Sequence, residues 1–208
     1  IKRVPGWLGR QSLGSYPMVD AVAGISAIWS DVDVYPALRE KNIRVVPIDM
    51  AHALMSGGER VAVVRIAAAE GEAVYPGYFW LSPANALLML GIMARDLSKL
   101  WPEHSVQLQQ NEAEMSRALR SIQIAMDNRL LDLDIMQVVV DNASLADLAA
   151  ALLLPIVSLE EAEESNLSTL YITGKKRVKN KPIMAKNFKN LNQISKKKLQ
   201  ATPYKLNC

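Results

Sequence analysis

The chain has 208 residues, half of them hydrophobic, which is enough to bury the core of one large domain or of two small lobes. No long uncharged apolar run occurs, so we expect no transmembrane helix. The single cysteine, Cys208, excludes an internal disulfide and a zinc site built from several cysteines. Residues 1–165 carry 13 Lys and Arg against 21 Asp and Glu, whereas residues 166–208 carry 11 basic residues and no acidic one. This change in composition predicts a boundary near residue 165. The basic isoelectric point therefore belongs to the tail, residues 166–208, and nucleic-acid binding is not expected of the body, residues 1–165.

The first part of the chain predicts a mixture of short helices and strands. Pro36 suits the first turn of a helix, and Asn42 can end that helix. A β-branched run follows, in which Pro47 favours an edge or a strand end. The expected elements are a short helix at 17–28, a helix at 35–41, and strands at 43–48 and 61–66.

Two longer helices are the most clearly patterned elements. Ser82 can cap the first, Pro83 suits its first position, and apolar residues spaced by three and four continue to Trp101. Pro102 ends this helix, and a second one follows over 103–132, with a length of about 45 Å at 1.5 Å per residue. Such a helix commonly spans a whole domain or joins two. Its apolar positions are Leu108, Met115, Leu119, Ile122, Met126, Leu130 and Leu133.

The next segment predicts a parallel strand-helix-strand unit. A strand is expected at 136–140, a helix at 144–154 and a second strand at 155–159. Short links between them imply a right-handed crossover. After residue 165 the pattern predicts only a possible short strand at 170–173. The dominance of Ala, Leu, Val and Ile over aromatic residues is common in α/β and all-α proteins.

Several segments together resemble one known family. The stretch Tyr78 to Ala86 (Tyr-Phe-Trp-Leu-Ser-Pro-Ala-Asn-Ala) is similar to a segment of the metal-type solute-binding proteins of bacterial ABC transporters. That family segment usually runs His, an aliphatic residue, Trp-Leu, Ser/Asp/Asn, Pro, any residue, Asn. The resemblance covers roughly residues 29–160, and the other segments that carry it are 42–49, 94–102, the long helix from Glu103, and 138–157.

The resemblance implies a divergent and truncated solute-binding protein. Its expected fold is α/β, with two Rossmann-like lobes joined by one long rigid helix and both lobes incomplete. Its expected function is to bind a divalent metal ion, zinc or manganese, in the cleft between the lobes and to deliver it to an ABC transporter permease. We expect a monomer in the periplasm or at the cell surface, with any secretion signal upstream of Ile1. The implied parts are an N-terminal lobe at 1–102, a linking helix at 103–133, a C-terminal lobe at 134–165 and a basic tail at 166–208.

Five residues are candidate metal ligands, because zinc and manganese sites need several N or O donors that converge on one point. The resemblance places Tyr78 where the family has a ligating His, and Asp141 and Asn142 where a second His often stands. It places His52 near the cleft, in the loop after a strand that ends near Asp49, and Asp49 is a comparable candidate. Asp141 and Asn142 also follow a strand directly, where α/β sheets bind ligands. For each candidate a structural role stays open, as a surface-loop His, cleft-lining aromatic, turn or helix cap.

Enzymatic activity is not expected. The sequence holds no Gly-x-Ser-x-Gly, His-Glu-x-x-His or Gly-x-Gly-x-x-Gly motif. Two alternatives to metal transport remain open. One is a non-catalytic interaction module whose basic runs at 175–181 and 196–198 contact nucleic acid or an anionic membrane. The other is a degenerate fragment without a ligand.

Overall fold

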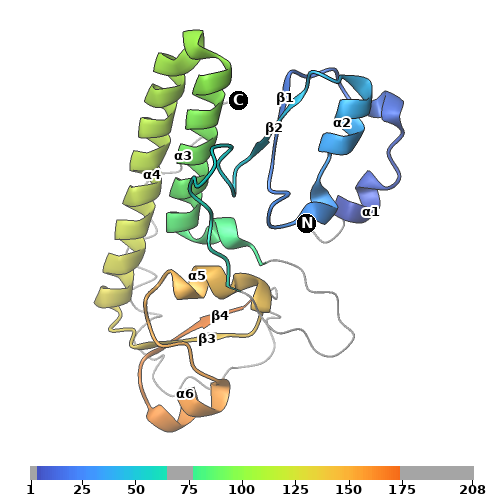
Figure 1. The fold of residues 1–208 in the computed structure, drawn as a ribbon. Coiled ribbons are helices and arrows are strands. Elements are labelled where there is room, and N and C mark those ends of the chain that lie inside the picture. The colour runs from blue at the N-terminus through green and yellow to red at the C-terminus, as the bar shows by residue number, and fades with distance from the viewer. Residues whose placement is uncertain (1–3, 65–76, 174–208) are drawn as a thin grey trace, which may run out of the picture. The chain divides into compact units, whose positions relative to one another are not determined.

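The computed structural model describes residues 4–64 and 77–173, which form short helices and strands beside two longer helices (Figure 1). Small parallel sheets occur both before and after the long helices, so the predicted α/β class is confirmed. Among the described residues, no helix is both long and apolar enough to cross a membrane. In chain order, with η for a 3-10 turn, the elements are α1 (Val4–Leu8), η1 (Leu13–Ser15), β1 (Ala21–Gly24), η2 (Ser30–Val32), α2 (Tyr35–Lys41), β2 (Val46–Asp49), η3 (Phe79–Leu81), α3 (Pro83–Leu100), η4 (Pro102–His104), α4 (Ser105–Asp132), β3 (Gln137–Val140), η5 (Ala143–Leu145), α5 (Ala146–Ala150), α6 (Leu159–Ser165) and β4 (Thr169–Ile172).

The first sheet pairs β1 with β2 in parallel, with Ala21 opposite Val46 and Gly24 opposite Asp49. The helix predicted at 17–28 is therefore wrong, because the middle of this stretch is a strand. Its small apolar residues carry only a weak helix signal, and the hydrogen bonds offered by β2 decide its conformation. The predicted strand at 43–48 is confirmed in part, since β2 begins later, at Val46.

The strand predicted at 61–66 is wrong for its described residues, and residues 65 and 66 lie outside the described part of the chain. Val61 is buried, but its N–H donates to the carbonyl oxygen of Ala51 in a loop. The N–H of Val64 donates to the side chain of Asp147. Backbone groups can be satisfied by loops and side chains as well as by a neighbouring strand, so an apolar run alone does not establish a strand.

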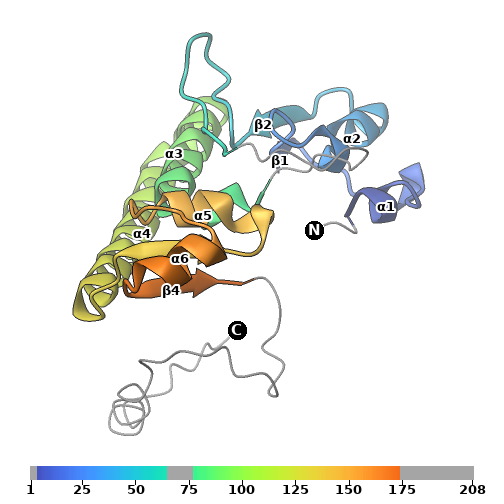
Figure 2. The same ribbon diagram turned by 90° about the horizontal axis from the view of Figure 1, so that it is seen from below.

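The two long helices match their predictions closely. Ser82 caps α3 by accepting a hydrogen bond from the N–H of Asn85, and Pro83 opens the helix. The helix α4 runs without a break for 28 residues, which is about 42 Å. It begins two residues later than predicted because η4 precedes it. Helices α3 and α4 lie side by side in both views (Figure 1 and Figure 2). Met115 and Ile122, two members of the predicted apolar stripe of α4, are exposed.

The second sheet pairs β3 with β4 in parallel, with Gln137 opposite Thr169 and Val140 opposite Ile172. Val138 packs in a cluster with Ala149 and Leu152, on the α5 side. The side chain of the preceding residue, Gln137, reaches the carbonyl oxygen of Ala162 in α6. Successive strand residues point to opposite faces, so the two helices cover different sides of the sheet. Strand β3 begins at Gln137 and ends at Val140, so the predicted strand at 136–140 is confirmed apart from its first residue.

The elements between β3 and β4 are shorter than predicted. The helix expected at 144–154 is reduced to η5 and the single short helix α5. The strand expected at 155–159 is reduced to one parallel bridge between Val138 and Ile156. Helix α6 was not predicted, although the sequence carries its signal. Ser158 and Glu161 form a capping box, in which each side chain accepts the other's backbone N–H.

Leu153 has an unfavourable backbone conformation, with φ of 56° and a side chain that is 90% exposed. This left-handed conformation disfavours every residue with a Cβ, and helices commonly end on Gly for that reason. We expect Leu153→Gly to raise the free energy of unfolding by roughly 0.5–1 kcal/mol in urea denaturation. Leu131→Gly, at an exposed position within α4, is the control and should lower it by about 1 kcal/mol. Destabilisation by Leu153→Gly would contradict this account of the turn after α5.

Candidate functional site

The carboxylate of Asp49, at the end of β2, accepts hydrogen bonds from nearby residues of the fold. One oxygen, Oδ2, accepts from the hydroxyl of Ser26 at 3.0 Å and from the N–H of Ala27. The other, Oδ1, accepts from the N–H of Ala51 at 2.8 Å. These bonds tie the turn after β1 to the end of β2. A cation would have to share the remaining lone pairs of this carboxylate or displace a bond.

His52 lies half-buried in the loop after β2, where its backbone forms an antiparallel bridge with Arg60. Helix α3 holds this loop at two consecutive residues. The fully buried Asp96 accepts a hydrogen bond from the N–H of Leu54 at 3.0 Å. Arg95 forms a 2.7 Å ion pair with Glu59, and its hydrogen bond lowers the pKa of the Glu59 carboxyl. The loop that carries His52 therefore has a fixed path over α3.

Tyr78 directly precedes η3, and its N–H donates to the carbonyl oxygen of Ser144 at 2.7 Å. Its half-buried ring lies 5.6 Å from that of Trp80. The next residue, Phe79, is fully buried in a cluster with Ala51. The segment Tyr78–Phe79 thus contacts the loop of His52 through Phe79 and the turn after β3 through the N–H of Tyr78.

Asp141 and Asn142 follow β3 at its carboxyl end. The side-chain oxygen of Asn142 accepts the N–H of Ser144 at 3.0 Å and so caps η5. This confirms the cap role that remained open for Asn142. Asp141 is exposed, and its N–H donates to the carbonyl oxygen of Ile172 at the end of β4. Both side chains thus lie at the edge of the sheet where α/β proteins bind ligands.

Asp147 is a further acidic residue of this region that sequence reasoning missed. It is 5% exposed, and its Oδ1 accepts the N–H of Val64 at 3.0 Å. Its Oδ2 is buried and has no hydrogen-bond partner among the described residues. Burial raises the pKa of the Asp147 carboxyl above its ordinary value, and the bond from Val64 opposes that rise. The sequence did hold a signal, an acidic residue within the apolar pattern of the predicted helix at 144–154.

The structure links the segments that carry several of the predicted ligands, through a backbone hydrogen bond and through apolar contacts of neighbouring residues. Tyr78 lies beside the turn capped by Asn142, and the Asp49–His52 loop shares a hydrophobic cluster with Phe79 and Trp80. Within residues 4–64 and 77–173, no three His, Cys, Asp or Glu side chains gather into a metal-binding group. A site built from the predicted residues would therefore depend on the phenol of Tyr78 and the amide of Asn142 as donors.

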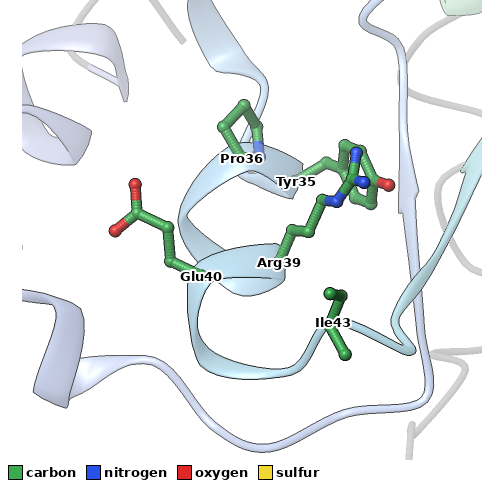
Figure 3. Close-up of a pocket in the computed structure, with 5 residues that line it drawn as sticks. All are labelled: Tyr35, Pro36, Arg39, Glu40 and Ile43. Atoms are coloured by element: carbon green, nitrogen blue, oxygen red, sulfur yellow. The ribbon is translucent and has the colours of Figure 1, made fainter.

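A surface hollow of about 430 Å³ lies elsewhere, on helix α2 (Figure 3). The guanidinium of Arg39 lies 6.0 Å from the centre of the Tyr35 ring, a cation–π arrangement. None of the five predicted ligands lines this hollow, so it is a separate feature. Its lining residues are Tyr35, Pro36, Arg39, Glu40 and Ile43.

Comparisons with known proteins find similarity in fold and none in sequence. No protein-family model matches the chain, and no curated protein is significantly similar to it. The structure of ZnuA has a TM-score of 0.51 at 18% identity, over 73% of this chain and 62% of ZnuA. A Zn(II)-bound mutant variant of AdcAII from Streptococcus pneumoniae has a TM-score of 0.54 at 14% identity, over 77% and 65% of the two chains. A mutant of FpvC from Pseudomonas aeruginosa has a TM-score of 0.55 at 13% identity, over 78% and 59%.

These similarities concern the fold alone. The chain spans about three fifths of the length of these solved structures. They support, at the level of the fold, the resemblance to metal-type solute-binding proteins that the sequence indicated. The division into two lobes, the predicted domain boundaries and the predicted ligands stay predictions.

Proposed function

We propose that the chain binds a divalent cation, zinc or manganese, between its two sheet-containing parts and delivers it to an ABC transporter permease. The fold supports this proposal, because similar structures include zinc-bound forms of ZnuA and AdcAII. The observation that carries it is the 2.7 Å hydrogen bond from the N–H of Tyr78 to Ser144. This bond puts a candidate ligand segment from the first half of the chain against the turn of Asn142 in the second half.

The proposed ligands are His52, Tyr78, Asp141, Asn142 and Asp49, a set dominated by oxygen. Oxygen donors suit manganese, whereas imidazole suits zinc, so His52 should matter more for zinc than for manganese. Groups that bind a metal ion must give up their protons to do so. We therefore expect metal binding to release protons and to strengthen as the pH rises.

The unbroken helix α4 also bears on how the protein would work. A continuous rod of 28 residues joining two lobes would resist a large hinge closure. The effect of cation binding is then expected to stay local, at the loops that carry Tyr78 and His52, without the swing of a lobe. The proposed protein is a monomer of the periplasm or cell surface and has no catalytic activity of its own.

Thermal unfolding of the full chain with and without metal tests the proposal. Excess ZnCl₂ or MnCl₂ should raise the melting temperature, since free ligand at 100 times Kd stabilises by about 2.7 kcal/mol. His52→Ala should weaken zinc binding more than manganese binding in calorimetric titrations. The matched control is His104→Ala, which alters an exposed histidine before α4 and should leave both affinities unchanged. A melting temperature that neither metal raises would reject cation binding and favour an interaction module or a fragment without a ligand.

A further inference from the structure

One short stretch of the second half of the chain receives two backbone N–H groups from the first half. The carbonyl oxygen of Ser144 accepts from Tyr78 at 2.7 Å, and Oδ1 of Asp147 accepts from Val64 at 3.0 Å. The two donors flank residues 65–76, which lie outside the described residues, whereas the two acceptors are only three residues apart. Asp147 and Ser144 therefore fix together where this part of the first half meets helix α5 and η5.

The second oxygen of Asp147 points to the same junction. A Cβ placed on Gly77 would lie 3.5 Å from Oδ2 of Asp147 and 3.0 Å from the carbonyl oxygen of Ser144. Gly77 is itself buried, so its missing side chain lets the backbone before Tyr78 approach both oxygens. Asp147 is therefore hydrogen-bonded to the backbone at Val64 and lies close to Gly77, on the two sides of residues 65–76.

Burial of this carboxylate needs an explanation. A polar group taken out of water costs free energy unless hydrogen bonds compensate for it, and an Ala or Leu would fill a helix interior without that cost. The compensation that the structure gives Asp147 comes from its own backbone N–H and from the N–H of Val64, a residue 83 positions earlier in the chain. The carboxylate therefore serves to hold that distant backbone in place, a task that an apolar side chain cannot perform.

We infer that Asp147 is a positioning residue of the proposed cation site, which holds Tyr78 beside the Asn142 turn through Val64 and Gly77. This inference rests on the proposed function, because Tyr78 is a ligand only if that function holds. The role inferred for Asp147 is to position the backbone and not to ligate the metal. Its carboxylate sets the backbone from which the Tyr78 ring extends, while Asn142 holds the facing turn through its cap to Ser144.

Amide hydrogen exchange in the metal-free full chain tests the positioning role on its own. In Asp147→Ala the amide of Val64 loses its acceptor, and we expect exchange at Val64 and Tyr78 to become on the order of tenfold faster or more. Asp147→Asn keeps an acceptor oxygen and should stay near the wild-type rates. Gly77→Ala leaves Asp147 intact but crowds Ser144, and it should accelerate exchange at Tyr78. The control is Glu163→Ala, an exposed acidic position on α6.

An unchanged exchange rate at Tyr78 in a folded Asp147→Ala protein would overturn the inference. An equal acceleration of exchange in Asp147→Ala and Asp147→Asn would overturn it as well. Zinc titration then separates this inference from the proposed function. Support requires a Kd that rises about tenfold or more in Asp147→Ala and is restored in Asp147→Asn, which a merely structural role would not produce. A wild-type Kd that Asp147→Ala leaves unchanged overturns the inference alone. A wild-type protein that binds neither metal overturns the proposed function and with it the role of Asp147 in cation binding.

Discussion

Phe79→Ala is expected to lower the free energy of unfolding by about 3–5 kcal/mol. Phe79 is 0% exposed and packs with Ala51, Val61 and Met89, which come from the loop after β2, a following segment and helix α3. Truncation removes the aromatic ring and leaves a cavity where these three segments meet. Such a loss is a large part of the roughly 5–15 kcal/mol that stabilises an ordinary domain.

Urea denaturation followed by circular dichroism would measure this loss. The matched control is Leu81→Ala, a large apolar residue of the same 3-10 turn that is 42% exposed. We expect that control to cost about 1 kcal/mol or less. Phe79→Leu should fall between the two, since it keeps part of the buried volume. Equal effects at positions 79 and 81 would show that Phe79 is not the centre of this cluster.

The sequence predicts the elements whose signals are local. Helix α3 has its cap and its proline within two adjacent residues, Ser82 and Pro83, and α4 repeats its apolar pattern over many turns. Helix α6 was also predictable, because Ser158 and Glu161 spell a capping box. The strand β1 was not, since its identity depends on pairing with β2, more than 20 residues away. A stretch of Ala, Val and Gly is compatible with either conformation until a partner is present.

The candidate site divides in the same way. The signal for the cap that Asn142 makes on η5 lies in neighbouring residues. The same is true of the position of Tyr78 directly before η3. The carboxylate bonds of Asp49 to Ser26 and Ala27 could not be predicted, because they cross 22 or 23 residues of chain. The bond from Val64 to Asp147 spans 83 residues, and no periodic pattern reveals it. What sequence could show is that an acidic residue in an apolar helical pattern needs a partner.

Asp96→Ala is expected to lower the free energy of unfolding by about 2–4 kcal/mol. Asp96 is 0% exposed, its Oδ2 accepts the N–H of Leu54 at 3.0 Å, and its Oδ1 lies 3.6 Å from Nζ of Lys99. The substitution leaves a part-buried N–H without its acceptor and opens a small cavity. Asp96→Asn keeps an acceptor oxygen in place and should cost less than half as much.

Lys99, the ion-pair partner of Asp96 on α3, allows the contribution of the ion pair to be compared with that of the Leu54 hydrogen bond. Lys99 is half exposed, so its ion pair with Asp96 is screened by water, and Lys99→Ala should cost about 1 kcal/mol or less. A loss in Lys99→Ala as large as that in Asp96→Ala would locate the stabilisation in the ion pair and contradict the role of the Leu54 bond.

Asp96 also links stability to the proposed site, because Leu54 lies two residues after His52 in the loop that Asp96 anchors. If that loop presents His52 to a cation, Asp96→Asn should largely retain zinc affinity. Glu59→Ala, which removes the exposed ion pair of the same loop with Arg95, should also change it little. Asp96→Ala should weaken zinc more than manganese, in parallel with His52→Ala, since both act on the imidazole. Equal weakening of the two metals by Asp96→Ala would mean that the loop acts on the whole site, and that His52 is not its specific contribution.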